Sequence, residues 1–322
     1  MESAKNTPRV SVIMPAYMTA HLIGRALDSV LEQSFREFEI VVVNDGSPDT
    51  PELEKVLGGY GDKIVYLKQE NKRAAGARNT AIGRAQGEFL AFLDSDDAWL
   101  PNHLAAQMKL FEDDPALDLV YCDGMVETPD WSRKFMDMCP SQGQASFEAL
   151  VVERCQIPVS TVVARKSALA KAAFFDESLP RCDDYDMWLR AAFWGAKVGY
   201  SCNVQVRFSG NRPGALSASN QKMIEAYWKI LEKALKTLPL DDSQRALVQQ
   251  RAAKIRANYL LEEGKVRLQE GRVSEAVASF SEANRHLQNP KLTVILLGLK
   301  TAPSATSKLV AFANRIRNGV VG

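Results

Sequence analysis

Residues 87–97 read Gly-Glu-Phe-Leu-Ala-Phe-Leu-Asp-Ser-Asp-Asp, an apolar run followed at once by three acids within four positions. The run Phe89–Leu93 is short and has no polar alternation, which predicts a strand buried on both faces. Parallel sheets are built from such strands, and their ligands bind beyond the carboxyl ends of the strands. The acids Asp94, Asp96 and Asp97 therefore stand where a ligand site is expected.

The sequence around this stretch repeats the alternation of strand and helix. Apolar runs predict strands at Val10–Met14, Ile40–Val43 and Lys63–Lys68, and periodic apolar patterns predict helices at about 22–31, at Ala74–Arg84 and from Asn102 to Phe111. This order is typical of an α/β fold in which a mostly parallel sheet lies between helices.

The carboxy-terminal third has a different pattern. Strand signals end near residue 217, and helical periodicity follows at Lys222–Leu238 and Ser243–Gln269. We therefore expect an α/β domain over residues 1–217 and a helical extension over residues 218–322. In the extension, four residues have a spacing that resembles one tetratricopeptide-type hairpin, namely Gly264, Ala276, Phe280 and Ala283.

The composition describes a globular chain of 322 residues, of which 46% are apolar and 25% charged. No apolar run approaches the roughly 18 residues that a membrane span needs. The five cysteines are scattered without a Cys-x-x-Cys pair, as is usual in a reducing compartment. We therefore expect a cytoplasmic protein.

The net charge of +1 conceals an asymmetry. Residues 1–215 hold 23 Lys and Arg against 30 Asp and Glu, a net charge of −7, whereas residues 216–322 hold 17 against 9, a net charge of +8. Near the end, the basic residues Lys308, Arg315 and Arg317 flank an apolar stripe made of Leu309, Phe312, Ala313 and Ile316. Such a helix suits peripheral contact with the inner face of a membrane, and it equally suits docking on the acidic part of the chain.

The residues after the first strand exclude two common phosphate-binding loops. Pro15-Ala16-Tyr17 stands there instead of Gly-x-Gly-x-x-Gly, and Gly-x4-Gly-Lys-Ser/Thr does not occur in the chain. The three crowded acids after Phe89–Leu93 repel one another, and a divalent cation with oxygen ligands relieves that repulsion. The cluster therefore predicts half of a clamp for Mg²⁺ or Mn²⁺ and a diphosphate. The alternative is a solvated acidic turn that caps the next helix.

A second acidic group, Asp183 and Asp184, opens an amphipathic helix pattern over residues 183–190. Acids at a helix amino terminus are commonplace partners of the helix dipole. Two acids near a metal–diphosphate site also supply a general base for an acceptor hydroxyl. The pattern alone leaves both interpretations open.

Five segments occur in the order found in family 2 glycosyltransferases of the GT-A fold, which the chain resembles over about residues 8–217. They are VSVIMPAY (10–17), FEIVVVNDGS (38–47), ARN (77–79), GEFLAFLDSDD (87–97) and DDYDMWLR (183–190). Each segment is weakly specific alone, whereas five in the right order are highly specific. The remaining third resembles only the variable helical tails of bacterial relatives.

The resemblance implies a role for each matching residue. Pro15, Ala16 and Tyr17 would border the nucleotide base, Asp45 would hydrogen-bond that base, usually uracil, and Arg78 would reach the nucleotide or its phosphates. The implied donor is therefore a nucleotide sugar, expected to be a UDP-sugar.

The acids would hold the metal and activate the acceptor. Asp96 is the expected direct ligand of Mn²⁺ or Mg²⁺, with Asp94 or Asp97 on the ribose or at a second metal position. Asp184 matches the family's catalytic base, and Asp183 stands where relatives often have Glu. The implied reaction is one in-line displacement that inverts the anomeric centre.

The acceptor implied by the resemblance is a glycan or a lipid-linked saccharide, in the synthesis of cell-surface polysaccharide, and no nucleic acid partner is expected. One departure concerns the metal. Many relatives have a His near the end of the domain, where this chain has Arg212. Arginine pairs with phosphate but does not ligate a metal.

Two other function classes use the same features. A nucleotidyltransferase on the same sheet is expected to have a glycine-rich, basic loop after the first strand, which Pro15-Ala16-Tyr17 does not provide. A non-catalytic scaffold that binds partners through its helical tail does not need the crowded acids Asp94, Asp96 and Asp97. Both alternatives are therefore less well supported than a glycosyltransferase.

Overall fold

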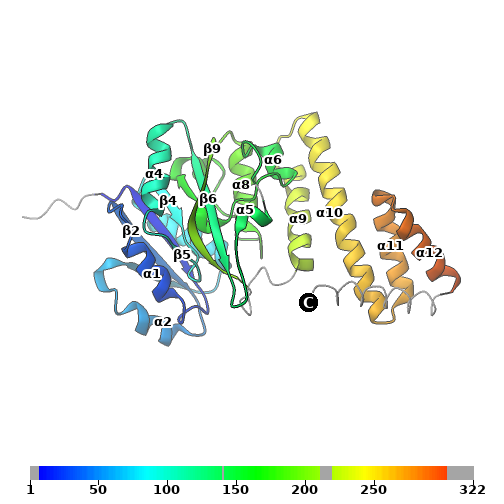
Figure 1. The fold of residues 1–322 in the computed structure, drawn as a ribbon, viewed down its shortest axis with the longest axis horizontal. Coiled ribbons are helices and arrows are strands. Elements are labelled where there is room, and N and C mark those ends of the chain that lie inside the picture. Colours follow the sequence, from blue (N-terminus) through cyan, green and yellow to red (C-terminus); the bar gives the residue numbers. More distant parts are fainter. Residues whose placement is uncertain (1–6, 140, 211–219, 303–322) are drawn as a thin grey trace, which may run out of the picture. The chain divides into compact units, whose positions relative to one another are not determined.

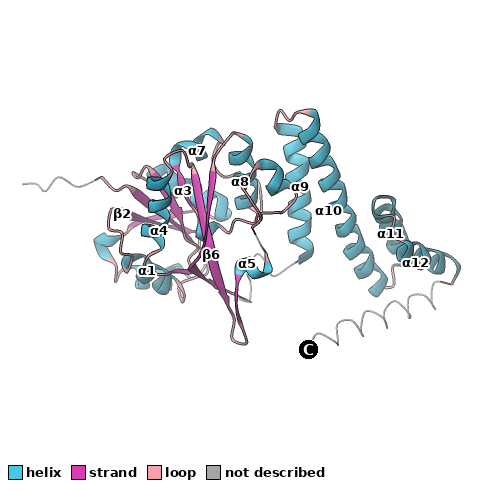
Figure 2. Cartoon of the chain, turned by 45° about the horizontal axis from the view of Figure 1, so that its top comes forward, coloured by secondary structure: helices cyan, strands magenta, loops and turns pink. Residues whose placement is uncertain are grey.

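A computed structural model describes residues 7–139, 141–210 and 220–302 of the chain. The chain folds into two compact units, Met1–Ala218 (unit 1) and Ser219–Gly322 (unit 2). Unit 1 contains all the described strands, and the described residues of unit 2 are helices and their connections (Figures 1 and 2). The expected α/β fold with an all-helical carboxy-terminal region is thus confirmed.

The centre of unit 1 is a nine-stranded sheet in the order β3-β2-β1-β4-β8-β6-β9-β5, with β7 paired to β6. The strands are β1 (Val10–Ala16), β2 (Phe38–Asp45), β3 (Val65–Gln69), β4 (Phe89–Phe92), β5 (Ala98–Trp99), β6 (Leu119–Glu127), β7 (Ser132–Lys134), β8 (Val163–Arg165) and β9 (Val198–Ser209). Strands β3, β2, β1 and β4 are parallel, and β8 runs antiparallel to β4 and to β6. The sheet is therefore mixed. Its parallel strands β3, β2, β1 and β4 are the ones that the apolar runs predicted, whereas the parallel pair β6 and β9 was not predicted.

Helices cover both faces of this sheet (Figure 1). Helices α1 (Ile23–Leu31), α2 (Thr50–Leu57) and α4 (His103–Asp113) pack on one face, in a core that includes Val12 and Met14 of β1. Helices α3 (Arg73–Arg84) and α8 (Asp183–Phe193) contribute to the other face, where Phe92 packs edge-on against Trp188. Unit 1 also has the short helices α5 (Phe135–Met138), α6 (Phe147–Val151) and α7 (Lys166–Lys171).

The element boundaries differ slightly from those expected. Strand β3 begins at Val65, because Gly61–Lys63 forms a 3-10 turn in front of it. Helix α4 spans His103–Asp113 and so continues two residues beyond the expected end. The ends of elements are the part of a sequence pattern that local propensity determines least.

Unit 2 consists of α9 (Asn220–Thr237), α10 (Asp242–Gln269), α11 (Val273–Leu287) and α12 (Pro290–Thr301). Asp241 caps α10 in a capping box, in which its carboxylate accepts a hydrogen bond from the backbone N–H of Gln244 at 2.8 Å. A core cluster joins α10, α11 and α12, and its members include Ala276, Phe280 and Ala283. Unit 2 therefore has an apolar core of its own.

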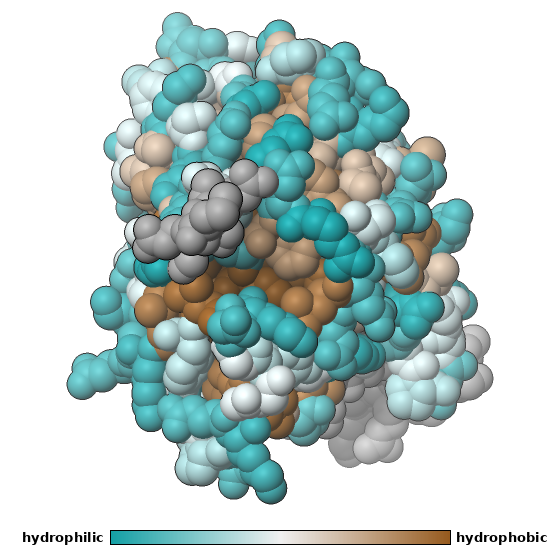
Figure 3. Space-filling view, turned by 90° about the vertical axis from the view of Figure 1, so that its left-hand side faces the viewer, coloured by the Kyte–Doolittle hydropathy of each residue, from teal (hydrophilic) through white to brown (hydrophobic). Residues whose placement is uncertain are grey.

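Among the described helices, none has both the length and the apolarity required to cross a bilayer. One face of the molecule is shown in Figure 3, where hydrophilic residues predominate around an apolar, hollowed middle. Arg212 and the expected basic stripe at residues 308–317 lie outside the described residues.

Candidate active site

The carboxyl ends of β1, β2 and β4 meet at one edge of the sheet. Ala16 of β1 lies beside Asn44 of β2, and Ile13 of β1 lies beside Phe92 of β4. Asp94 follows Phe92 by two residues and therefore comes to the edge at which β1 and β2 also end. The fold thus brings together three segments that are separate in the sequence.

The end of β1 combines buried and exposed side chains. Ala16 is fully buried, whereas the Tyr17 side chain is 45% exposed and can offer its ring to a ligand. The Met18 amide donates a hydrogen bond to Ser47 Oγ at 2.6 Å, which joins this end to the loop after β2. Pro15, paired with Val43 of β2, completes the short segment.

Asp45, the last residue of β2, is almost completely buried. Its Oδ1 accepts hydrogen bonds from Gln69 Nε2 at 2.7 Å and from the Lys72 amide at 2.8 Å. Burial raises the pKa of Asp45, and these two hydrogen bonds oppose the rise. Gly46 has a positive φ of 63°, and a Cβ there would lie 2.8 Å from the Asn71 amide nitrogen. Asp45 therefore fixes the loop between β3 and α3 against the end of β2.

The turn after β4 holds the carboxylates of Asp94, Asp96 and Asp97. One oxygen from each lies within 4.8 Å of the other two. Asp97 is buried. Its Oδ2 accepts a hydrogen bond from Ser160 Oγ at 2.6 Å, and its Oδ1 accepts one from the Ser209 amide at 3.1 Å. Burial, and then repulsion by Asp96 and Asp94, raises the pKa of Asp97 well above its usual range. With a partner on each oxygen, Asp97 anchors the turn to the rest of the sheet.

The two other acids of the turn have the donor chemistry that a divalent cation requires. Asp94 has a side chain that is one-third exposed, and its Oδ2 has no hydrogen-bond partner in the described part of the chain. Asp96 is half-buried, and its carbonyl oxygen accepts hydrogen bonds from Ser209 Oγ and Arg25 Nη2. Mg²⁺ and Mn²⁺ favour carboxylate oxygens and usually take only one or two of them from the protein. The unpartnered Oδ2 thus favours Asp94 over Asp97 as a metal ligand.

Arg78 of α3 binds two carboxylates at once. Its Nη2 donates to Asp94 Oδ1 at 2.7 Å, and its Nη1 donates to Asp183 Oδ2 at 2.6 Å. The side chain is buried, and its guanidinium carbon lies 5.5 Å from the centre of the Phe175 ring. The guanidinium therefore holds the acidic turn against the start of α8. The family resemblance implied a different role for Arg78, a contact with the nucleotide or its phosphates.

The second acidic group lies at the first turn of α8. The Cys182 backbone has a φ of 55° just before the helix, and Asp183 is buried against Arg78. Burial, with repulsion from Asp183, raises the pKa of Asp184 to about 6, and attraction to Arg78 opposes the rise. A carboxylate with this pKa is largely ionised at neutral pH and is a better proton acceptor than an ordinary Asp.

Two residues of this arrangement, Ser160 and Ser209, have no signal in the sequence. Ser160 belongs to the 3-10 turn Val159–Thr161, and Ser209 is the last residue of β9. They are 63 and 112 residues from Asp97 along the chain, so only the fold identifies them. Arg212, the expected phosphate contact, lies outside the described residues.

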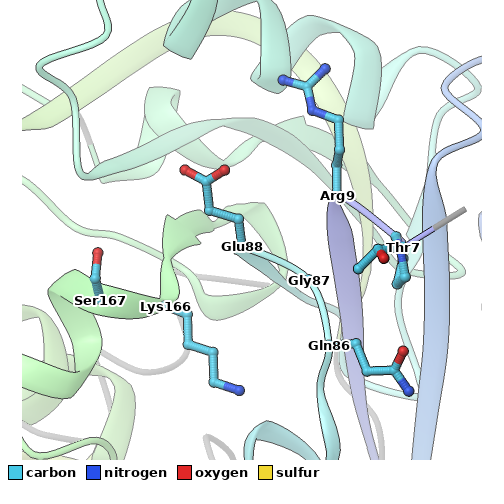
Figure 4. Close-up of a pocket in the computed structure, with 8 residues that line it drawn as sticks. Thr7, Arg9, Gln86, Gly87, Glu88, Lys166 and Ser167 are labelled. Carbon is cyan, nitrogen blue, oxygen red and sulfur yellow. The ribbon is translucent and has the colours of Figure 1, made fainter.

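A separate hollow of about 550 Å³ lies near the amino ends of β1 and β4 (Figure 4). It is lined by Thr7, Pro8, Arg9, Gln86, Gly87, Glu88, Lys166 and Ser167. The side chains of Arg9 and Lys166 point away from each other, and Lys166 Nζ donates to the Ala85 carbonyl at 2.8 Å. The polar groups of this hollow do not converge, and none of the candidate site residues lines it.

Comparison with known proteins gives relatives of one kind. The family described as "Glycosyl transferase family 2" matches residues 11–169. The Escherichia coli protein named UDP-Glc:alpha-D-GlcNAc-diphosphoundecaprenol beta-1,3-glucosyltransferase WfgD is 30% identical over 227 residues, which cover 69% of this chain and 85% of WfgD. The amylovoran biosynthesis glycosyltransferase AmsB of Erwinia amylovora is 32% identical over 197 residues, covering 58% of this chain and 65% of AmsB. In five Rickettsia proteins named as uncharacterized glycosyltransferases, the match covers only 27% to 60% of the relative's length.

Solved structures share the fold. The crystal structure of S. aureus TarS 1-349 has a TM-score of 0.65 at 17% identity, over 95% of this chain and 91% of that one. The mannosyltransferase PcManGT from Pyrobaculum calidifontis, in complex with GDP-Man and Mn²⁺, has a TM-score of 0.61 at 21% identity, over 96% of this chain and 86% of that one. Together with the extent of the WfgD match, the family match shows that the chain belongs to glycosyltransferase family 2, with a GT-A fold and a helical carboxy-terminal region.

Proposed function

We propose that this protein transfers a sugar from a nucleotide-diphosphate donor, a UDP-sugar, to a hydroxyl of a glycan or lipid-linked acceptor, with inversion at the anomeric carbon. The observation that carries the proposal is the bridge made by Arg78 between Asp94 and Asp183. It holds a carboxylate turn suited to a metal-bound leaving group next to Asp184, a carboxylate suited to a base. On this proposal, stabilisation of the leaving group and base catalysis act on opposite sides of one guanidinium.

The relatives support the choice of donor and acceptor. WfgD is named for UDP-Glc and a diphosphoundecaprenol-linked acceptor, and AmsB for polysaccharide biosynthesis. TarS has been solved in complex with UDP and with UDP-GlcNAc. We therefore infer a UDP-sugar as donor, a lipid-linked saccharide as the first acceptor to test, and a place in the synthesis of a cell-surface polysaccharide.

On the donor side, Tyr17 and Asp45 border the nucleotide base, together with Pro15 and Ala16. Asp94 and Asp96 would hold Mn²⁺ or Mg²⁺, which would offset negative charge on the departing diphosphate. Asp97 keeps the turn in place through Ser160 and Ser209. Arg212 is a proposed additional contact of the diphosphate.

On the acceptor side, Asp184 takes the proton of the attacking hydroxyl while the acceptor oxygen bonds to the anomeric carbon and the bond to the diphosphate oxygen breaks. One displacement of this kind inverts the anomeric configuration. Asp183 forms an ion pair with Arg78, and the same cation limits the rise of the Asp184 pKa. Asp183 is thus proposed to position the base, not to replace it.

The test is transfer by the purified chain from a panel of UDP-sugars, in the presence of Mn²⁺, to undecaprenyl-diphosphate-linked GlcNAc and to related acceptors. Asp96→Ala is expected to lower turnover at least 100-fold, while Asp62→Ala, an exposed acid in the 3-10 turn before β3, leaves it unchanged. Donor hydrolysis without acceptor supplies a second readout. Turnover that survives Asp96→Ala contradicts the metal assignment. Release of pyrophosphate from UTP and a sugar phosphate would instead identify a nucleotidyltransferase.

A further inference from the structure

The outer face of α12 is unusually apolar. Val294 is 68% exposed and Leu297 60% exposed, more than the other large apolar side chains of the described residues. Both face away from the core, because Leu292, Leu296 and Leu299 occupy the buried side of the same helix. A helix that is apolar on both faces is normally covered on both. We therefore expect another surface to cover the outer face of α12.

Lysines frame this face. Lys291 and Lys300 are exposed and lie three residues before Val294 and three residues after Leu297. At 100° per residue the four side chains spread over half of the helix circumference, with the apolar pair in the middle and a lysine on each side. This is the arrangement of helices that lie in a membrane interface, with apolar side chains inserted and cations level with the headgroups.

The cations near α12 are not neutralised within the described chain. Elsewhere in unit 2 each of Arg256, Arg267 and Arg272 pairs with a glutamate. Lys291 and Lys300, by contrast, form no ion pair with a described residue, and the sequence has no acid after Glu282. The surface is therefore positively charged as well as apolar.

This charge distribution selects among the partners that could cover the face. A second copy of the chain would bring Lys291 and Lys300 against the same lysines. The tail after α12 would bring Lys308, Arg315 and Arg317 against them, again without an acid. Both contacts place like charges together at an apolar surface, which is unfavourable. An anionic lipid bilayer complements both the charge and the apolarity.

We propose that the outer face of α12, formed by Lys291, Val294, Leu297 and Lys300, is a docking surface for an anionic membrane. The helix lies parallel to the bilayer, with Val294 and Leu297 in the acyl boundary and the lysines among the headgroup phosphates. Each lysine and each inserted apolar side chain adds to the binding free energy. The surface is independent of the proposed transfer reaction, because no residue of the candidate active site takes part in it.

The test is co-sedimentation of the full chain with vesicles of equal parts phosphatidylglycerol and phosphatidylcholine, and with vesicles of phosphatidylcholine alone. We expect binding to the anionic vesicles that is at least about tenfold tighter and that weakens with added salt. The double variants Val294→Ser/Leu297→Ser and Lys291→Glu/Lys300→Glu should each lower binding about tenfold or more.

Matched controls are available in α9 and α10. Val266→Ser removes another exposed apolar side chain of unit 2, and Lys236→Glu/Lys254→Glu makes the same change in net charge. Both should bind within about twofold of the parent chain. Circular dichroism establishes that each variant keeps its helix content, so that lost binding does not reflect unfolding.

Three results would overturn the proposal. The first is binding of the parent chain that does not distinguish the two vesicle types, or binding that is unchanged in Val294→Ser/Leu297→Ser. The second is a dimer in sedimentation that this double variant abolishes, which assigns the face to a second copy. The third is a Val294→Cys thiol that reacts far more slowly with a maleimide than Val266→Cys in the lipid-free protein, which assigns the face to a segment of the same chain.

Discussion

Arg78 holds two carboxylates of the candidate active site with a single guanidinium. Asp94 comes from the end of β4 and Asp183 from the start of α8, and the N–O distances are 2.7 and 2.6 Å. A planar fork of donors serves both partners, which a lysine ammonium does not do. Since Asp183 and Arg78 are both buried, removal of the cation leaves a buried carboxylate without its partner.

Arg78→Met is therefore expected to lower the free energy of unfolding by about 3–5 kcal/mol, and Arg78→Lys by less. Urea unfolding followed by fluorescence measures both. Arg84→Met is the matched control, since Arg84 lies exposed on the same helix and should cost no more than about 0.5 kcal/mol. An Arg78→Met chain as stable as the Arg84→Met chain would show that the bridge contributes nothing to the fold.

Ionisation of the buried Asp184 carboxyl is expected to lower the free energy of unfolding. Burial raises its pKa from the usual 3.8 to about 6, so the folded chain binds this proton more tightly than the unfolded chain does. Ionisation of Asp184 therefore lowers stability progressively as the pH rises from about 4 to about 6. Asp184→Asn should raise the free energy of unfolding by about 1–2 kcal/mol at pH 7.5, and this gain should vanish towards pH 4.

On the proposed mechanism, the same group should govern the pH dependence of transfer. The base must be ionised to accept a proton, so kcat/KM of the parent chain should rise with pH through an apparent pKa near 6. Asp184→Asn should abolish transfer while UDP binding persists, and Asp62→Asn should alter neither the pH profile nor the stability. A flat profile between pH 5 and 8 would place the base elsewhere.

For single residues, the sequence predicts which side chains belong to the site better than it predicts what those side chains contact. Asp45 and Asp94 could be found because each ends or closely follows an apolar strand whose end is a ligand site by topology. Arg78 could be found as part of a motif, but its partner Asp183 is 105 residues away in the chain. The bridge, and the anchoring of Asp97 by Ser160 and Ser209, arise only when distant segments are brought together.

Whole strands could be predicted from the sequence where both of their faces are buried. Strands β1, β2 and β4 are buried on both faces, so their sequences are continuous apolar runs. Strand β9 is mostly half-exposed, and its pairing with β6 shifts register around Asp123. Such a strand has neither a continuous run nor a clean alternation, and for this reason β9 and the part of the sheet around it could not be predicted from the sequence.

The crossing of α10 and α11 in unit 2 depends on the absence of a side chain at Gly264. A Cβ at this position would lie 2.5 Å from Cε1 of Phe280, a buried ring of α11. Alanine gains about 1 kcal/mol of helix propensity over glycine, but overpacking of a core costs about 1–3 kcal/mol. The spacing of Gly264 and Phe280 thus reflects close approach of two helices.

Gly264→Ala is expected to destabilise the chain by about 1–2 kcal/mol despite its higher helix propensity. Gly83→Ala is the matched control: Gly83 lies in α3 with nothing near its added Cβ, so the same change should stabilise by up to about 1 kcal/mol. A double-mutant cycle with Phe280→Leu tests the mechanism, since the smaller side chain should relieve the penalty. Equal effects of the two glycine substitutions would exclude a steric cause.

At the scale of the whole molecule, each of the two units has an apolar core among its described residues. The larger core lies between the sheet and helices α1, α2 and α4, and the other joins α10, α11 and α12. The described site residues, from Pro15 to Ser209, belong to unit 1. A ligand that binds only the folded form of unit 1 should therefore stabilise that unit selectively.

Differential scanning calorimetry with Mn²⁺ and UDP tests this expectation. At ligand concentrations 100 times the dissociation constant, unit 1 should gain about 2.7 kcal/mol, which raises its Tm by roughly 5–10 °C. The transition of the helical unit 2 should stay in place, as followed by its share of the helical circular dichroism signal. EDTA, or Asp96→Asn in place of the parent chain, should remove the shift, while Asp62→Asn should retain it. An equal shift of Tm in the Asp96→Asn chain would mean that the acidic turn after β4 does not bind the cation.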